Sequence, residues 1–145
     1  MKIEPNSKHG LLCVCASVLT SAMCVNGQSS AQPGSPAERL LLAGRPLVIA
    51  HRGYSQIAPE NTLPSFKLAK TAGADMVELD YHHSKDGELI VIHDPTLDRT
   101  TDAVAKWGGS KIRVEDKTLA ELKTLDAGKW FDPQFAGTRL PTLAE

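Results

Sequence analysis

The stretch MVELDYHH, from Met76 to His83, places two carboxylates, Glu78 and Asp80, in an apolar run that is typical of a strand. Side chains of a strand alternate between its two faces, so Glu78, Asp80 and His82 are expected to share one face. Two like charges side by side repel each other, and burying them is costly unless something compensates. The sequence therefore predicts that another group, positive in charge, lies next to this pair.

Apolar runs bounded by strand-breaking residues lie on both sides of this stretch. Before it, PLVIA (residues 46–50) predicts a buried strand, and after it, LIVIH (residues 89–93) predicts another. DMVELDY, which overlaps the opening stretch, is the strand between them. A helix that is capped by Asn61 or Thr62 and stopped by Gly73 separates the first two strands. The segment SKDGE is a turn before the third strand. Strands that alternate with helices predict a parallel α/β sheet that is buried on both faces.

The rest of the chain gives weaker signals. Residues 94–117 are expected to be irregular, and TLAELKTL begins a helix in which Thr118 and Glu121 have capping-box spacing. Thr142 and Glu145 repeat that spacing at the end of the sequence. Two or three strand–helix units cannot close a barrel, which takes about 250 residues. We therefore expect a fragment or a truncated gene product.

Composition and charge restrict the function further. The net charge is −1, from 16 Lys and Arg against 17 Asp and Glu, which gives no basic field for nucleic acid. Residues 1–31 resemble a secretory signal, with Lys2 and Lys8 before the apolar run of residues 11–25, which is too short for a stable membrane span. A secreted or periplasmic location is therefore expected. The chain divides into residues 1–31, a linker and short helix at 32–45, and a domain at 46–145.

The three cysteines all lie within the predicted signal, so a mature chain that has lost it contains none. Disulfide frameworks and thiolate metal sites are then excluded. A metal ion would have to bind oxygen or imidazole ligands instead.

Titratable side chains gather at the ends of the three predicted strands. His51 follows the first strand, Glu78 and Asp80 end the second, and His93 ends the third. In parallel α/β folds the carboxyl ends of the strands form the active-site face. A hard divalent cation, Ca2+ or Mg2+, would turn the repulsion between the two carboxylates into attraction. The alternative is a solvated pair, or one that is paired with Arg52 or Lys85.

Three further side chains fit chemistry on a phosphate ester. Arg52 offers a planar fork that suits an anionic phosphate, although a salt bridge with Glu60 is the alternative. His51 and His93 suit a general base and a general acid, because imidazole titrates near neutral pH. A single histidine is more often structural, but these two flank the carboxylate pair. Together these groups could stabilise the transition state of phosphodiester hydrolysis.

These residues lie in four ordered motifs. The motifs are HRGYSQIAPENTLPSF (51–66), ADMVELDYHHSKDGELIVIHDPTLDRTT (74–101), LAELKTLDAGKWF (119–131) and RLPTLAE (139–145). With this ordered set the sequence resembles the glycerophosphodiester phosphodiesterase family from about residue 47 to its last residue. The resemblance implies the N-terminal portion of a TIM-type (β/α)8 barrel, which is incomplete in this chain, and metal-dependent hydrolysis of small-molecule glycerophosphodiesters to glycerol 3-phosphate and an alcohol.

The resemblance also assigns roles to residues. It implies Glu78 and Asp80 as metal ligands and Arg52 as a phosphate ligand. His51 and His93 match the acid–base pair, which in the family allows a glycerol hydroxyl to attack phosphorus and water to open the resulting cyclic phosphate. An alternative within the family makes His93 a metal ligand. The motif PENT contributes Glu60 and Asn61, for which a structural role in holding the loop after the first strand suffices.

The resemblance further implies a third acidic ligand and a lysine from a later strand, beyond residue 145. On that basis the 145-residue chain alone is expected to be inactive. Two alternatives stay open: a related phosphodiesterase acting on lysophospholipids or phosphoinositides through the same residues, and a truncated remnant that binds phosphate esters without turnover.

Overall fold

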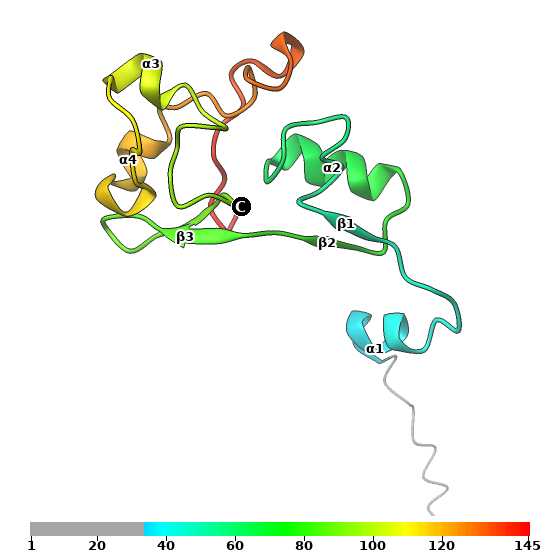
Figure 1. Cartoon of the computed structure of the whole chain (residues 1–145). Coiled ribbons are helices and arrows are strands. Elements are labelled where there is room, and N and C mark those ends of the chain that lie inside the picture. Colours follow the sequence, from blue (N-terminus) through cyan, green and yellow to red (C-terminus); the bar gives the residue numbers. More distant parts are fainter. Residues whose placement is uncertain (1–33) are drawn as a thin grey trace, which may run out of the picture. The chain divides into compact units, whose positions relative to one another are not determined.

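The computed structural model describes residues 34–145 (Figure 1). The predicted secretory segment, residues 1–31, lies outside the described residues. The described chain is one unit, Gly34–Glu145, with short strands, short helices and long connections. In chain order its elements are α1 (Pro36–Leu41), β1 (Ile49–His51), α2 (Leu63–Thr71), β2 (Met76–Glu78), β3 (Tyr81–His83), β4 (Leu89–Val91), α3 (Ala103–Trp107), the 3-10 helix η1 (Val114–Asp116), α4 (Leu119–Leu122) and the 3-10 helix η2 (Pro133–Phe135).

The helices that begin at strong local signals form where the sequence predicts them. Thr62 caps α2 by accepting a hydrogen bond from the Ser65 backbone N–H, and α2 is followed by Ala72 and by Gly73, which has a φ of +88°. Thr118 and Glu121 form the expected capping box of α4. At the end of the sequence, only half of such a box forms, because Glu145 Oε2 accepts from the Thr142 backbone N–H but the Thr142 hydroxyl accepts no bond from the Glu145 N–H within the described residues. Local side-chain chemistry is sufficient to place these starts.

The first predicted strand is displaced and open to solvent. β1 covers Ile49–His51 rather than residues 46–50, and it pairs in parallel with β2, with His51 opposite Glu78. The prediction of a buried strand was wrong, because Val48 is 59% exposed and Ile49 is 54% exposed. Within residues 34–145 β1 has only β2 as its strand partner, and its outer residues, Ile49 and His51, are exposed. The parallel pairing itself was predicted correctly.

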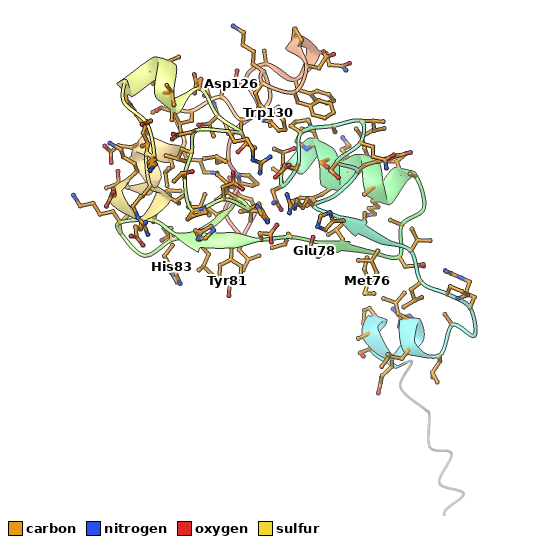
Figure 2. All side chains as sticks on the ribbon, in the orientation of Figure 1. Met76, Glu78, Tyr81, His83, Asp126 and Trp130 are labelled. Carbon is orange, nitrogen blue, oxygen red and sulfur yellow. The ribbon has the colours of Figure 1, made fainter. Side chains whose placement is uncertain are left out.

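The second and third predicted strands form a different arrangement from the one expected. The run DMVELDY is interrupted at Leu79 and Asp80, and the chain then continues as β3, which pairs with β4 in an antiparallel hairpin. The expectation of a wholly parallel sheet is therefore wrong. The short turn that contains Gly87 cannot accommodate the long crossover that parallel strands need. Figure 2 shows Tyr81 and His83 on one side of β3, as strand alternation requires.

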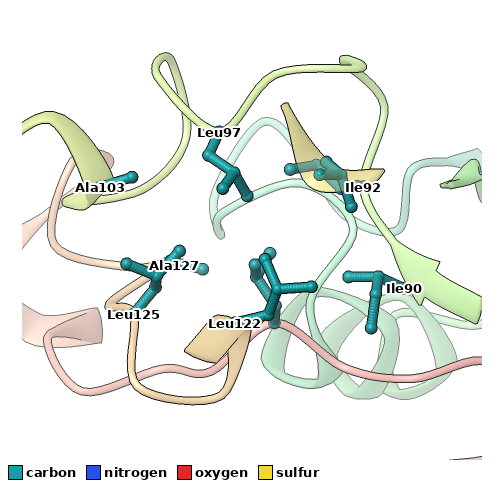
Figure 3. Close-up of a cluster of buried hydrophobic side chains, with 9 residues drawn as sticks. Ile90, Ile92, Leu97, Ala103, Leu122, Leu125 and Ala127 are labelled. Carbon is teal, nitrogen blue, oxygen red and sulfur yellow. The ribbon is translucent and has the colours of Figure 1, made fainter. Parts of the chain in front are cut away.

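The hydrophobic core lies beside the hairpin, where β4 packs with the segments that follow it (Figure 3). Its largest fully buried members include Ile90, Leu97, Leu122 and Leu125. The segment 94–117, which was expected to be irregular, contains α3 and η1, and Ala103 and Val114 bring them into this core. The core therefore fixes β4 and the residues that follow it. In the part of the chain that the structure describes, no helix is long and apolar enough to cross a membrane.

Candidate active site

The polar site begins at the carboxyl ends of β1 and β2, which the parallel register places side by side. His51 lies opposite Glu78, and the distance from its Nε2 to Glu78 Oε2 is 3.9 Å. The Arg52 backbone N–H donates to the same Glu78 oxygen at 3.0 Å. The pairing of β1 with β2 therefore brings His51, Arg52 and Glu78 together.

The loop that follows β1 folds back onto Arg52. The Asn61 backbone N–H donates to the Arg52 carbonyl oxygen at 3.0 Å, and the Ser65 hydroxyl donates to the same oxygen at 3.1 Å. Both Arg52 and Asn61 have positive φ values, 56° and 55°. Such a backbone conformation in a residue other than glycine costs of order 1–3 kcal/mol and is concentrated at functional sites.

Asn61 connects this loop to Asp80. Its side-chain Nδ2 donates to Asp80 Oδ2 at 3.1 Å, and its Oδ1 accepts from the Asp80 backbone N–H at 3.3 Å. The Asp80 carbonyl oxygen in turn accepts from the Ile92 backbone N–H at 3.0 Å, which brings the end of β4 next to Asp80. His93, the residue after Ile92, thus belongs to the same region as Glu78 and Asp80.

Arg52 is the positive group nearest to Asp80. Its Nη1 donates to Glu60 Oε1 at 3.1 Å, and its Nε is 3.5 Å from Asp80 Oδ2. That Nε is buried and has no hydrogen-bond partner within the described residues. The pairing of Asp80 with Arg52 that the sequence left open as an alternative to a metal is therefore present. The Arg52–Glu60 ion pair, which was the alternative to a phosphate-binding Arg52, is present as well.

The carboxylates of Glu78, at the end of β2, and Asp80, two residues beyond it, fit a divalent cation in their chemistry, since Ca2+ and Mg2+ prefer oxygen ligands. One oxygen of each carboxylate already accepts a hydrogen bond, Glu78 Oε2 from the Arg52 backbone N–H and Asp80 Oδ2 from the Asn61 side chain. Within residues 34–145 no cluster of three or more His, Cys, Asp or Glu side chains forms a ready metal site. Glu78 and Asp80 could therefore hold a cation only together with waters, substrate oxygens or a further carboxylate.

Asp94 and Arg99 were not singled out from the sequence, although they lie at the centre of the charged contacts. Asp94 Oδ1 is 2.7 Å from His93 Nδ1. Arg99 donates to Asp94 from Nε at 2.7 Å and from Nη2 at 2.9 Å. The available signal was local, since the carboxylate directly follows the histidine and the arginine lies five residues beyond it.

Arg99 also binds Glu60, which is far from it in the sequence. Its Nη2 donates to Glu60 Oε1 at 2.7 Å and its Nη1 to Glu60 Oε2 at 3.0 Å. The hydrogen bonds from Arg99 to Glu60 lower the pKa of the Glu60 carboxyl, and those from Arg99 to Asp94 hold the pKa of the Asp94 carboxyl well below its usual range. Both carboxylates therefore stay ionised at neutral pH.

The remaining histidines of the hairpin differ in their contacts. His82 Nε2 lies 3.0 Å from the His93 carbonyl oxygen, so this nitrogen must carry the proton. The ring of His83 packs edge-on against Tyr81, with 6.4 Å between the ring centroids. Figure 2 shows His83 and Tyr81 projecting together from β3. His82 therefore supports the site by holding the backbone of His93.

Comparison with known proteins supplies independent information. The family model described as "Glycerophosphoryl diester phosphodiesterase family" matches residues 51–145. A glycerophosphodiester phosphodiesterase of Caldanaerobacter subterraneus subsp. tengcongensis is 54% identical over 99 residues, which cover 68% of this chain and 38% of that protein. Glycerophosphodiester phosphodiesterase 1 of Mus musculus is 35% identical over 136 residues, which cover 90% of this chain and 39% of that protein.

Solved structures give the same relationship. A glycerophosphodiester phosphodiesterase from Agrobacterium tumefaciens has a TM-score of 0.61 and 44% identity, and the match covers 68% of this chain and 40% of that one. A phosphodiesterase of Oleispira antarctica, solved with the product sn-glycerol-3-phosphate, has a TM-score of 0.63 and 43% identity over 72% of this chain and 39% of that one. The chain thus spans less than half the length of these relatives.

Proposed function

Because the chain belongs to the glycerophosphoryl diester phosphodiesterase family, we propose that it contributes to hydrolysis of glycerophosphodiesters to glycerol 3-phosphate and an alcohol. The observation that carries this proposal is the convergence of His51, Arg52, Glu78 and Asp80 where β1 and β2 end. The fold that goes with it is the N-terminal portion of a TIM-type (β/α)8 barrel. The contacts of the site suit an anionic phosphodiester, because they combine a partly buried guanidinium with imidazoles that can move protons.

Arg52 is the proposed phosphate ligand. Its side chain is 20% exposed, its Nη1 is held by Glu60, and its buried Nε has no hydrogen-bond partner in the described chain. A buried N–H without an acceptor costs about 1–3 kcal/mol. This Nε faces Asp80 Oδ2 at 3.5 Å, so a phosphate oxygen would bind the exposed part of the guanidinium, whose fork matches the geometry of the phosphate group.

Glu78 and Asp80 are the proposed ligands of a divalent cation, Ca2+ or Mg2+. When bound, such an ion supplies positive charge that stabilises the additional negative charge of the transition state. The chain's own contribution is to hold two carboxylates at the end of one strand. The Arg52 backbone N–H fixes one oxygen of Glu78, and the Asn61 side chain fixes one oxygen of Asp80.

His51 and His93 are the proposed acid–base pair. One imidazole accepts the proton of the attacking hydroxyl, and the other gives a proton to the alcohol oxygen as its bond to phosphorus breaks. If the attacking group is a glycerol hydroxyl, the product of this step is a cyclic phosphate. The same two histidines then activate water and protonate the ring oxygen, which gives glycerol 3-phosphate.

The test is hydrolysis of glycerophosphocholine by the protein as its own cell makes it, with choline release as the readout. His51→Ala is expected to lower kcat by at least 100-fold, since removal of an acid–base group alone costs about 10²–10⁴-fold. Glu78→Ala is expected to lower kcat by at least as much, because it removes a proposed ligand of an ion that contributes several kcal/mol of transition-state stabilisation. His83→Ala is the matched control, because this ring packs on Tyr81. Turnover that is unchanged in both site variants would refute the proposal. Substrate binding without product in the unaltered protein would favour a binding remnant.

A secreted or periplasmic location is part of the proposal. It is supported by the sequence of residues 1–31, with two lysines before an apolar run. N-terminal sequencing of the protein isolated from its own cell tests it. A mature chain that begins between about residues 28 and 32 supports export, and one that begins at Met1 contradicts it.

A further inference from the structure

Arg99 joins two segments that are distant in the sequence. Its guanidinium binds both oxygens of Asp94, which follows β4, and both oxygens of Glu60, which lies in the loop after β1. These contacts are 2.7–3.0 Å long. The side chains of Glu60 and Asp94 are only 14% and 24% exposed. We refer to Asp94, Arg99 and Glu60 as the Arg99 clamp.

Each carboxylate of the clamp holds one proposed active-site residue. Asp94 binds Nδ1 of His93 at 2.7 Å, and Glu60 binds Nη1 of Arg52 at 3.1 Å. The clamp is therefore a continuous set of charged hydrogen bonds from the proposed acid–base histidine to the proposed phosphate ligand. The proposed function makes no use of Arg99 itself, which touches neither His93 nor Arg52 in the contacts of the described chain.

The contact between Asp94 and His93 determines which ring nitrogen carries the proton. An ionised carboxylate can only accept, so His93 Nδ1 must be the donor. In the neutral ring Nε2 then has a free lone pair, as a general base requires. Arg99 holds both Asp94 oxygens by charge-assisted bonds, which keeps this acceptor ionised and fixed in orientation.

We propose that Arg99 is a positioning residue that sets the place of His93 and Arg52 relative to each other by bridging Asp94 and Glu60. This inference rests on the proposed function, because positioning matters only if both residues act on one substrate. The planar fork of arginine can bind two carboxylates at once. Lysine has the same charge but presents a single nitrogen, so it cannot reproduce the four contacts.

The test compares Arg99→Lys with Arg45→Lys in the protein as its own cell makes it, because the 145-residue chain alone is expected to be inactive. Arg45 makes a similar two-pronged contact with Asp75, at 2.8 and 2.6 Å, next to β1 and β2. Arg99→Lys is expected to lower kcat on glycerophosphocholine by roughly 10–100-fold and to raise KM, since a misplacement of about 1 Å can cost 10²-fold. Arg45→Lys is expected to keep both constants within about twofold. Added guanidinium ion is expected to restore part of kcat to Arg99→Ala.

A second measurement does not depend on turnover. Nitrogen-15 NMR of the imidazoles at pH 9, where an ordinary imidazole is neutral, reports which ring nitrogen of His93 is protonated. We expect the Nδ1–H form in the unaltered protein and a mixture of both forms in Arg99→Lys. Absence of any phosphodiesterase activity would refute the proposed function but leave this readout decisive.

Three results would refute the proposed role of Arg99. One is an unaltered protein in which His93 is protonated at Nε2. A second is Arg99→Lys with kcat, KM and His93 signals all unchanged. If Arg99→Lys loses only thermal stability while the kinetic constants of the folded protein persist, Arg99 is structural and the proposal is also refuted. If that variant does not fold, the His93 signals of the unaltered protein test the proposal, and protonation at Nε2 refutes it.

Discussion

Gly53→Ala tests the packing that holds Arg52 in place. Gly53 has a φ of +82°, and a β-carbon added there would lie 2.9 Å from both the carbonyl carbon and the β-carbon of Ser65. It would also meet the Ser65 hydroxyl, which donates to the Arg52 carbonyl oxygen. Backbone atoms cannot move away as a flexible side chain can, so α2 and the loop must separate.

The cost of this substitution has two sources. An alanine in the left-handed backbone conformation lowers the free energy of unfolding by about 1–2 kcal/mol. The smaller conformational freedom of the unfolded chain offsets about 0.4–1 kcal/mol of this loss. Overpacking adds about 1–3 kcal/mol. The matched control is Gly73→Ala, because Gly73 has a φ of +88° but an added β-carbon there meets nothing within 4 Å in the described chain. Gly53→Ala should therefore lose about 1–3 kcal/mol more free energy of unfolding than Gly73→Ala.

Urea denaturation followed by circular dichroism measures the difference. With a slope of about 1–3 kcal/mol per molar urea, a further loss of 2 kcal/mol moves the midpoint by roughly 1 M. Equal midpoints for the two variants would show that Ser65 does not pack against Gly53, and the proposed anchoring of Arg52 would then be wrong. Hydrolysis of glycerophosphocholine is expected to fall in Gly53→Ala and to persist in Gly73→Ala.

Three further predictions concern the metal, acid and the core. Added Ca2+ should raise Tm in thermal scans relative to scans with EDTA, because a hundredfold excess of the ion over Kd raises the free energy of unfolding by about 2.7 kcal/mol. Asp80→Asn should abolish this rise in Tm. An equal rise in the unaltered protein and in Asp80→Asn would exclude Asp80 as a ligand. The hydrogen bond from Arg45 lowers the pKa of Asp75 from 3.8 to about 2, so its stabilisation is complete above about pH 4 and is lost as the pH falls through 2. Urea curves from pH 5 to pH 2 should therefore show a flatter dependence for Asp75→Asn, and identical slopes would contradict this. Leu122→Ala, at a fully buried position, should cost about 2–5 kcal/mol in urea denaturation, whereas Leu41→Ala, at an 83% exposed position, should stay within about 0.5 kcal/mol.

The sequence predicted best what depends on neighbouring residues. Thr62 and Thr118 cap their helices because each side chain reaches a backbone N–H only three residues away. The Asp86-Gly87 turn forms as predicted, since Gly87 supplies a φ of +88°. The pairing of the strands on either side of this turn was nevertheless predicted to be parallel, which was wrong. A turn this short requires the antiparallel pairing of β3 and β4 that is observed.

The strand predictions failed where burial depends on distant segments. An apolar run indicates a strand, but its sequence does not tell which layers will cover it. Ile49 and Val77 are exposed in the described chain although they lie in apolar runs, whereas Ile90 is fully buried because the segments after β4 pack on it. Periodicity was therefore informative about the existence of a strand and uninformative about its surroundings.

The composition of the site was largely determined by the sequence itself. Which side chains lie at the strand ends follows from the order of strands and breakers, and this singled out His51, Arg52, Glu78, Asp80 and His93. Whether they bind metal and substrate stays a prediction. The ordered motifs also identified the family, which the match over residues 51–145 confirms.

Only the tertiary structure decided how these side chains are connected. Arg99 and Glu60 are 39 residues apart, yet they meet in a two-pronged ion pair that joins the loop after β1 to the segment after β4. No local pattern encodes that contact, because it arises when the core under β4 and the β1–β2 pairing fix both segments at once. Sequence determines which charges are present, and packing determines which of them come within hydrogen-bonding distance.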